Sequence, residues 1–178
     1  MKWIHQFFGG QKEMAALTAG TKAPDFSLQA IDGKTFVLRD ALQHGPVLVA
    51  FFKISCPVCQ YTFPYLERLY KAFANQNVTI VGVSQDNAVN TRGFLSEFGI
   101  TFPTLLDDPK DYAVSNAYGL TNVPTLFLIN PDGEIEVSSV GWVKKEILDI
   151  SRRLAAAQKT SPPLVFEVGE EIRDFRAG

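Results

Sequence analysis

The chain has 178 residues, of which 46% are hydrophobic, and a formal net charge of −2 at pH 7. This length and composition fit one globular domain with some extensions, and the charge balance, without any basic run, argues against nucleic-acid binding. With only two cysteines, the chain cannot be a small domain held together by disulfides.

Residues 1–19 are expected to form a lead-in to the main domain. Bulky apolar side chains would share one face of a short helix there, namely Trp3, Ile4, Phe7 and Phe8. That face is expected to pack on its own domain or on a neighbouring copy, with a membrane surface or a partner as the alternative. The apolar stretch is too short and interrupted for a secretory signal, and no run is long enough to span a membrane. We therefore expect a cytoplasmic protein, and assembly into a homo-oligomer stays open.

Residues 20–42 have the pattern of a β-hairpin. Apolar residues alternate on both arms, and Asp32-Gly33 supplies the turn because glycine tolerates positive φ. The alternating residues are Phe26 and Leu28 on the first arm and Phe36 and Leu38 on the second.

A predicted buried strand leads directly into a cysteine pair. Val47–Phe52 is apolar at every position, as a central strand covered on both faces should be. A turn then brings Cys56-Pro57-Val58-Cys59 to the start of a helix expected over residues 57–75. Cysteines at positions i and i+3 of a helix share one face, at a separation that a disulfide tolerates. The pair is therefore predicted to be a reversible dithiol, because CxxC beside a β–α pattern favours redox chemistry over a structural bridge.

The later elements indicate a mixed sheet. They are a strand over 78–83, a helix over 88–98, an extended piece over 101–106, a short helix over 112–118, a hairpin of 125–129 and 134–139, and a helix over 144–158. Residues 20–158 are thus expected to form one α/β domain, a central sheet with parallel and antiparallel parts covered by helices on both faces. The tail, residues 159–178, is expected to pack on the domain, near the N-terminal hairpin, or on a partner, with a floppy tail as the alternative.

Three separated features resemble the thioredoxin superfamily: CPVC at a strand-to-helix turn, Val123-Pro124-Thr125 opening the second hairpin, and the added N-terminal APDFSL…DG…L hairpin. The last feature is similar to the redoxin and TlpA-like branch of thiol-disulfide oxidoreductases, which is related to the alkyl hydroperoxide reductase/thiol-specific antioxidant family. The resemblance implies a thioredoxin-like fold with an added N-terminal hairpin. It also implies that Pro124 follows a cis peptide bond beside the cysteines and that the backbone of Val123 pairs with a bound substrate. Pro57, between the cysteines, is expected to border the same substrate site.

The two cysteines are expected to play different roles. Cys56 precedes the helix, where unsatisfied N–H groups and the helix dipole favour its thiolate, which is the attacking species. Cys59 lies one turn inside on the apolar stripe, so it should stay protonated and later resolve the mixed disulfide. Lys53 is the nearest cation and is predicted to stabilise the Cys56 thiolate, the alternative being a solvated lysine at a strand end. We expect no cofactor beyond the Cys56–Cys59 disulfide, and as partners protein thiols or disulfides with an upstream reductase or thioredoxin.

The sequence departs from these relatives at three positions near the motif. The buried aspartate of thioredoxin, six residues before the first cysteine, is replaced by Ala50. The glutamate often found three residues after the second cysteine is replaced by Thr62, and the usual tryptophan just before the motif is Ser55. No obvious carboxylate is left to take a proton from Cys59.

Two other functions compete with disulfide exchange. A thiol peroxidase is the nearer one, because peroxiredoxins share the N-terminal hairpin. Their Pro-x-x-x-Thr/Ser-x-x-Cys signature is not met at Cys56, where Val49 and Lys53 stand in the first two places, nor at Cys59. The other is a non-enzymatic redox-sensing or metal-carrying module. No metal site is expected, because neither histidine has ligand spacing to the cysteines.

Overall fold

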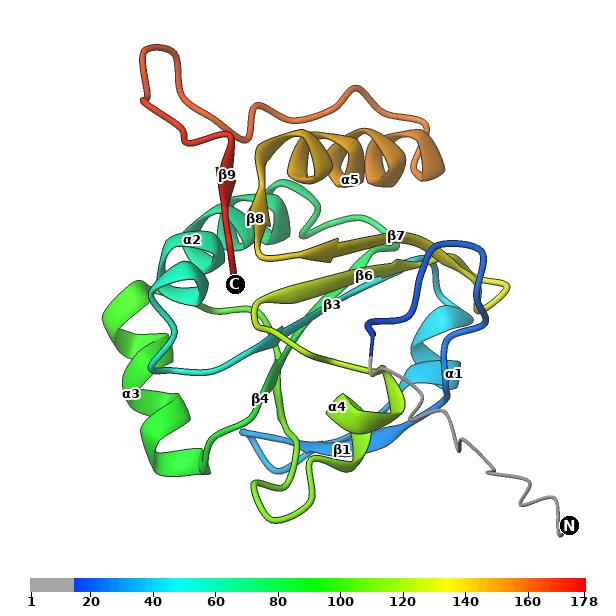
Figure 1. Ribbon diagram of the computed structural model, residues 1–178. Helices are drawn as coiled ribbons and strands as arrows, with labels where there is room; N and C mark the ends of the chain where they lie inside the picture. The colour runs from blue at the N-terminus through cyan, green and yellow to red at the C-terminus, as the bar shows by residue number, and fades with distance from the viewer. Residues whose placement is uncertain (1–14) are drawn as a thin grey trace, which may run out of the picture.

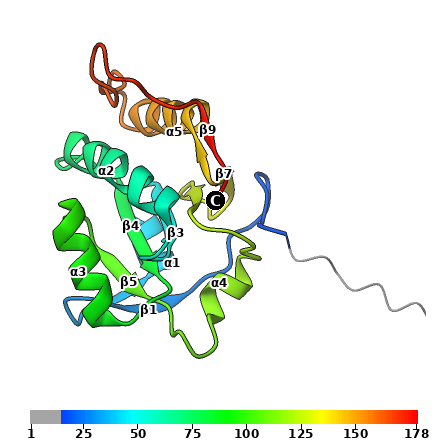
Figure 2. The ribbon, with the colours of Figure 1, turned by 60° about the vertical axis from the view of Figure 1, so that its left-hand side comes forward.

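The structure, a computed structural model, describes residues 15–178; the apolar face expected around Trp3, Ile4, Phe7 and Phe8 lies outside them. Within this range the main sheet has seven strands: β1 (Ser27–Ala30), β2 (Thr35–Val37), β3 (Val47–Phe52), β4 (Thr79–Ser84), β5 (Thr104–Leu106), β6 (Thr125–Ile129) and β7 (Ile135–Val140). The helices of the same range are α1 (Leu38–Leu42), α2 (Pro57–Ala72), α3 (Ala88–Phe98), α4 (Ala113–Ala117) and α5 (Lys144–Ala157). They cover both faces of the sheet (Figures 1 and 2).

The sheet is mixed, as its sequence predicted. The strand order is β2-β1-β5-β4-β3-β6-β7, with β3, β4 and β5 parallel and β6 and β7 antiparallel. The N-terminal hairpin of β1 and β2 extends the sheet through an antiparallel pairing of β1 with β5. The predicted fold class, including the added hairpin, is therefore confirmed.

Strand β3 lies at the centre and is buried along its whole length. Because successive side chains of a strand point to opposite faces, it contributes to two cores. Leu48, Ala50 and Phe52 pack with residues of α2, α3 and α5, whereas Val47, Val49 and Phe51 pack with residues of α1 and α4. Because both faces of β3 pack into a core, the loop that follows it starts from a fixed position.

The second arm of the N-terminal hairpin is shorter than predicted. It ends at Val37, and Leu38 begins α1 instead of continuing the strand. Leu38 and Leu42 stand four residues apart, which is a helical spacing, and both are buried. Both leucines pack into the core from one face of α1, which favours the helix at this point in the chain.

The tail lies beside α2 and α5, not beside the N-terminal hairpin as expected (Figure 1). Phe175–Arg176 forms β9, which pairs antiparallel with β8 (Trp142–Val143). The indole nitrogen of Trp142 donates a hydrogen bond to the carbonyl of Arg173 at 2.6 Å. The tail is placed by partners on α2 and β8 that lie 31 or more residues away in sequence. Within residues 15–178, no helix has the length and apolar character to cross a membrane.

Candidate active site

The cysteine pair occupies the first turn of α2. Cys56 is the N-cap residue, and its sulfur accepts a hydrogen bond from the backbone N–H of Cys59 at 3.3 Å. Pro57 is the first helical residue, where no N–H is needed. The first turn of a helix leaves backbone N–H groups without partners, and here the Cys56 sulfur occupies the position that a capping oxygen takes in other helices. Both thiols are free; Cys56 is half-buried and Cys59 is fully buried.

The loop before β6 lies against this turn. The Val123–Pro124 peptide bond is cis, and the Cys56 thiol donates a hydrogen bond to the carbonyl of Val123 at 3.2 Å. The Thr125 hydroxyl donates to the carbonyl of Asn122 at 2.8 Å and steadies the loop. Because β3 and β6 are antiparallel neighbours, the end of β3 and the start of β6 meet at one sheet edge. This pairing brings together residues that are 67 positions apart.

Cys59 is kept as a thiol by its surroundings. Burial raises the pKa of the Cys59 thiol well above its ordinary value, and the neighbouring Cys56 and the charge of Asp86 raise it further. The two cysteines are therefore chemically distinct: one is partly exposed at a helix start, and the other is enclosed in the core.

Asp86 is a site residue that sequence reasoning missed. Its carboxylate accepts a hydrogen bond from the backbone N–H of Ile54 at 2.8 Å, and the amide nitrogen of Gln60 donates to the carbonyl of Ile54 at 3.0 Å. Ile54 is thus held at both polar groups of its backbone, two residues before Cys56. The signal was present in the sequence: Asp86 follows β4, and parallel neighbours such as β3 and β4 end at the same sheet edge.

Lys53, Ala50 and Thr62, which the sequence singled out around the motif, all lie close to it. The carbonyl of Lys53 accepts from the backbone N–H of Cys56 at 3.2 Å, but among the described residues no hydrogen bond joins the Lys53 ammonium to the Cys56 sulfur. Ala50 is buried in the core, and the buried Thr62 hydroxyl donates to the carbonyl of Val58 within α2 at 2.7 Å. Residues 15–178 contain no group of three His, Cys, Asp or Glu side chains that could hold a metal ion.

A thioredoxin-like sheet with a CxxC pair at a helix start and a cis-proline loop beside it defines the class of dithiol redox proteins. The chain belongs to the AhpC/TSA family, whose family model matches residues 19–138.

Curated relatives and solved structures agree with this assignment. The chain is 32% identical over 147 residues to thiol-disulfide oxidoreductase ResA of Bacillus subtilis (strain 168), covering 82% of this chain and 80% of the relative. It is 34% identical over 143 residues to ResA of Geobacillus thermodenitrificans (strain NG80-2), with 80% and 79% covered.

Among solved structures, it resembles a putative thiol:disulfide interchange protein DsbE from Chlorobium tepidum, with a TM-score of 0.70, 25% identity, and 81% and 99% of the two chains covered. A putative thioredoxin from Neisseria meningitidis gives a TM-score of 0.67, 30% identity, and 79% and 93% covered. The predicted enzyme class, a thiol-disulfide oxidoreductase, is confirmed.

Proposed function

We propose that this enzyme exchanges disulfides with protein partners through a mixed disulfide at Cys56, which Cys59 then resolves. The observation that carries the proposal is the position of the Cys56 sulfur. It lies between the N–H of Cys59, at 3.3 Å, and the carbonyl of Val123, at 3.2 Å. On one side of this sulfur, the N–H of Cys59 can donate to the thiolate. On the other side lies the backbone of Val123, along which a substrate segment can pair.

In the first step, the Cys56 thiolate attacks one sulfur of the partner's disulfide. A Cys56–partner disulfide forms, and the partner's second sulfur leaves as a thiolate that takes up a proton. The Cys59 N–H stabilises the attacking thiolate by donating to it. Within residues 15–178, the N–H of Val123 donates to no other residue, so a partner backbone carbonyl can accept from it. Pro57, next to Cys56, borders the surface on which the partner segment would bind.

In the second step, Cys59 loses its proton and attacks the sulfur of Cys56. The Cys56–Cys59 disulfide forms, and the partner is released as a dithiol; run backwards, the same steps oxidise a partner. Because Cys59 is held as a thiol, this step needs a proton acceptor. We propose Asp86 for that role, because its carboxylate lies beside the loop before Cys56 and, within residues 15–178, only one of its two oxygens accepts a hydrogen bond.

Three finer expectations belong to this proposal. The reaction needs no cofactor beyond the cysteine pair, an upstream reductase or thioredoxin returns the enzyme to its dithiol form, and the cytoplasm is the predicted compartment, which cell fractionation tests.

Residues 20–158 are taken as the catalytic domain. The Lys53 ammonium is assigned to stabilise the Cys56 thiolate; if Lys53→Ala leaves the thiol titration and alkylation rate of Cys56 unchanged, this assignment is wrong.

The decisive experiment is a trapping comparison of two variants. Cys59→Ser should accumulate a mixed disulfide with partner proteins at Cys56, because the resolving thiol is gone, whereas the matched control Cys56→Ser should accumulate none. If Cys56→Ser traps the partner instead, the two roles are reversed. Wild-type enzyme should also reduce insulin disulfides and consume hydrogen peroxide only slowly; the opposite preference would favour the peroxidase.

A further inference from the structure

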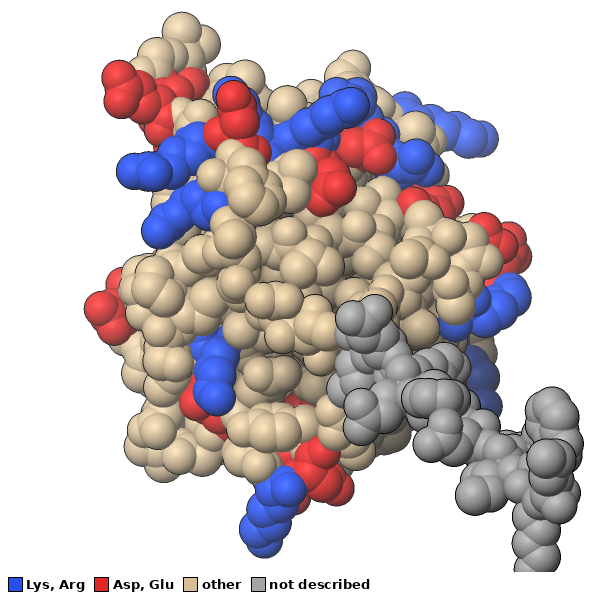
Figure 3. All heavy atoms as spheres, viewed as in Figure 1, with Lys and Arg blue, Asp and Glu red and all other residues tan. Residues whose placement is uncertain are grey.

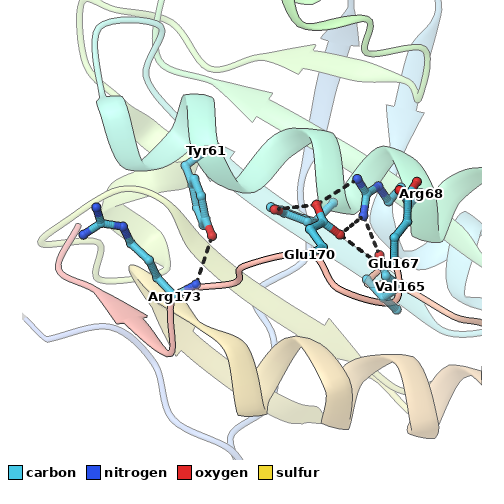
Figure 4. A network of polar contacts seen from close by, with 7 residues as sticks. Tyr61, Arg68, Val165, Glu167, Glu170 and Arg173 are labelled. Atoms are coloured by element: carbon cyan, nitrogen blue, oxygen red, sulfur yellow. Dashed lines mark hydrogen bonds and ion pairs between the residues drawn. The ribbon is translucent and has the colours of Figure 1, made fainter.

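The tail is clamped onto α2 by a network of polar contacts (Figure 4). Glu170 forms a bidentate pair with the guanidinium of Arg68 at 2.8 and 3.1 Å, and the hydroxyl of Tyr65 donates to the same carboxylate at 3.1 Å. Further along the tail, the backbone N–H of Arg173 donates to the hydroxyl of Tyr61 at 3.3 Å. These contacts direct the following residues toward the first turn of α2, where the cysteines lie.

The segment after this clamp, residues 174–178, lies against the cis-proline loop. We call it the tail end. The side-chain amide of Asn122 donates to the carbonyl of Gly178 at 3.1 Å. A Cβ atom placed on Gly178 would lie 2.7 Å from the carbonyl oxygen of Val123, and one placed on Gly141 would lie 2.8 Å from the nitrogen of Gly178. The backbone of the tail end therefore fills the space beside Asn122, Val123 and Gly141, which we call the docking strip.

The tail end is held more weakly than the clamp. Its strand pairing spans two residues, and the side chain of Phe175 is 62% exposed. The guanidinium of Arg176 lies over the ring of Tyr61 at 5.0 Å. The backbone N–H of Lys144 donates to the carbonyl of Asp174 at 2.9 Å. The side chains of the two residues approach only to 3.9 Å, and because the Asp174 side chain is 95% exposed, this ion pair stabilises little. The tail end can thus leave the docking strip while the clamp stays in place.

We propose that the tail end is an internal ligand of the docking strip, and that a partner segment binds by replacing it. This inference rests on the proposed function, in which a partner disulfide reaches Cys56 alongside Val123. Since the carbonyl of Val123 faces both the Cys56 thiol and Gly178, an extended partner segment cannot run along the docking strip while Gly178 is there.

The tail end also indicates what kind of segment the docking strip accepts. The close approach to Val123 and Gly141 leaves no room for a side chain at the position of Gly178. Two residues earlier, the cationic side chain of Arg176 lies over the ring of Tyr61. In Figure 3 the surface below the C-terminus is largely uncharged, whereas charged side chains gather above it, so backbone pairing and the cation over Tyr61 provide the recognition. The partner is therefore an extended protein segment with a small residue against Val123 and a lysine or arginine two positions before it.

The experiment compares the full chain with a variant that lacks residues 174–178, using two substrates. Removing the tail end should raise kcat/KM for insulin disulfides by about tenfold if the tail end occupies the docking strip nine-tenths of the time, because apparent affinity scales with the competent fraction. The rate with a small disulfide, hydroxyethyl disulfide, should stay unchanged, since it needs no docking strip. A synthetic peptide of residues 173–178 should restore the inhibition of the shortened variant.

Two point variants keep the test independent of folding in the shortened chain. Arg176→Ala should raise kcat/KM for insulin about threefold, the effect expected from losing one partly exposed cation–π contact. Val168→Ala changes a tail residue that is 96% exposed and outside the tail end, so it should change neither rate.

The possible results separate the two proposals. Equal insulin rates for all forms, a slower shortened variant, or equal changes with both substrates would each overturn the internal-ligand inference. If no form reduces either disulfide, the proposed function itself is refuted, and this inference with it.

Discussion

Replacing Asp86 by alanine tests whether its carboxylate positions the loop before the cysteine pair. In the wild type, this carboxylate accepts from the N–H of Ile54 at 2.8 Å. Asp86→Ala removes the acceptor without adding bulk, and the partly buried Ile54 N–H loses its protein partner. Of the two hydrogen bonds that hold the backbone of Ile54, only the one from Gln60 to its carbonyl would remain.

The expected loss follows from the kind of hydrogen bond that is removed. A hydrogen bond to a charged group contributes about 1.5–3 kcal/mol to stability, and a neutral one about 0.5–1.5 kcal/mol. Since Asp86 and Ile54 are both only partly buried, water can replace part of the lost bond, and we expect the lower end, about 1.5 kcal/mol. Asp86→Asn, the matched control, keeps an oxygen acceptor and should lose roughly half as much.

Urea unfolding of the reduced proteins at pH 7 measures this difference. The same substitution should also lower the pKa of Cys59, because the charge of Asp86 adds to the raising effect of burial. The pH dependence of Cys59 alkylation, measured in a Cys56→Ser background, reports that change. If Asp86→Ala unfolds at the wild-type urea midpoint and leaves the alkylation profile in place, the carboxylate neither holds the loop nor acts on Cys59.

Three further predictions concern the tail clamp and the buried thiol. The hydrogen bond to Arg68 holds the pKa of Glu170 at about 2, below its ordinary 4.5; this stabilisation is present above pH 4.5 and is lost as the pH falls through 2. In thermal unfolding, Glu170→Gln should therefore be less stable than wild type at pH 7 and match it near pH 2, and a constant difference would contradict the assignment. Trp142→Phe leaves the carbonyl that accepts from the indole unpaired and should cost about 1–3 kcal/mol in urea unfolding; an unchanged midpoint would show that this bond does not stabilise the fold. Under native conditions, Cys59 in Cys56→Ser should react with iodoacetamide far more slowly than Cys56 in Cys59→Ser, because Cys59 is 0% exposed. The two rates should converge in urea, and equal native rates would refute the burial of Cys59.

Local patterns predicted the elements around the cysteines. The apolar run Val47–Phe52 is β3 without a change of boundary, and α2 begins at Pro57 as expected. Both leave a signal within a few consecutive residues: a strand covered on both faces is apolar throughout, and a helix start is marked by its cap and its proline. The place of Val123–Pro124 beside Cys56 came from the resemblance to a family, since nothing in its local sequence requires it.

Long-range partners account for what the sequence did not reveal. Asp86 accepts from a backbone N–H 32 residues away, and only the parallel pairing of β3 and β4, not the spacing of the two residues, indicates that contact. Glu170 pairs with Arg68, 102 residues away. In the sequence alone, nothing distinguishes Glu170 from the other charged residues of the tail. Leu38 fitted two patterns, a step of two from Phe36 and a step of four to Leu42. The choice between them depended on which neighbours could bury it.

The position of Trp142 gives the protein a built-in optical reporter. It is one of two tryptophans in the chain, its ring contacts Tyr61 at 4.9 Å between centroids, and its nitrogen is bonded to the tail. Tyr61 stands two residues after Cys59 on α2. The indole therefore contacts both the helix that carries the two cysteines and the tail that ends beside them. With Trp3 changed to phenylalanine, fluorescence from this single indole would follow redox turnover and tail release in the same cuvette, without any attached dye.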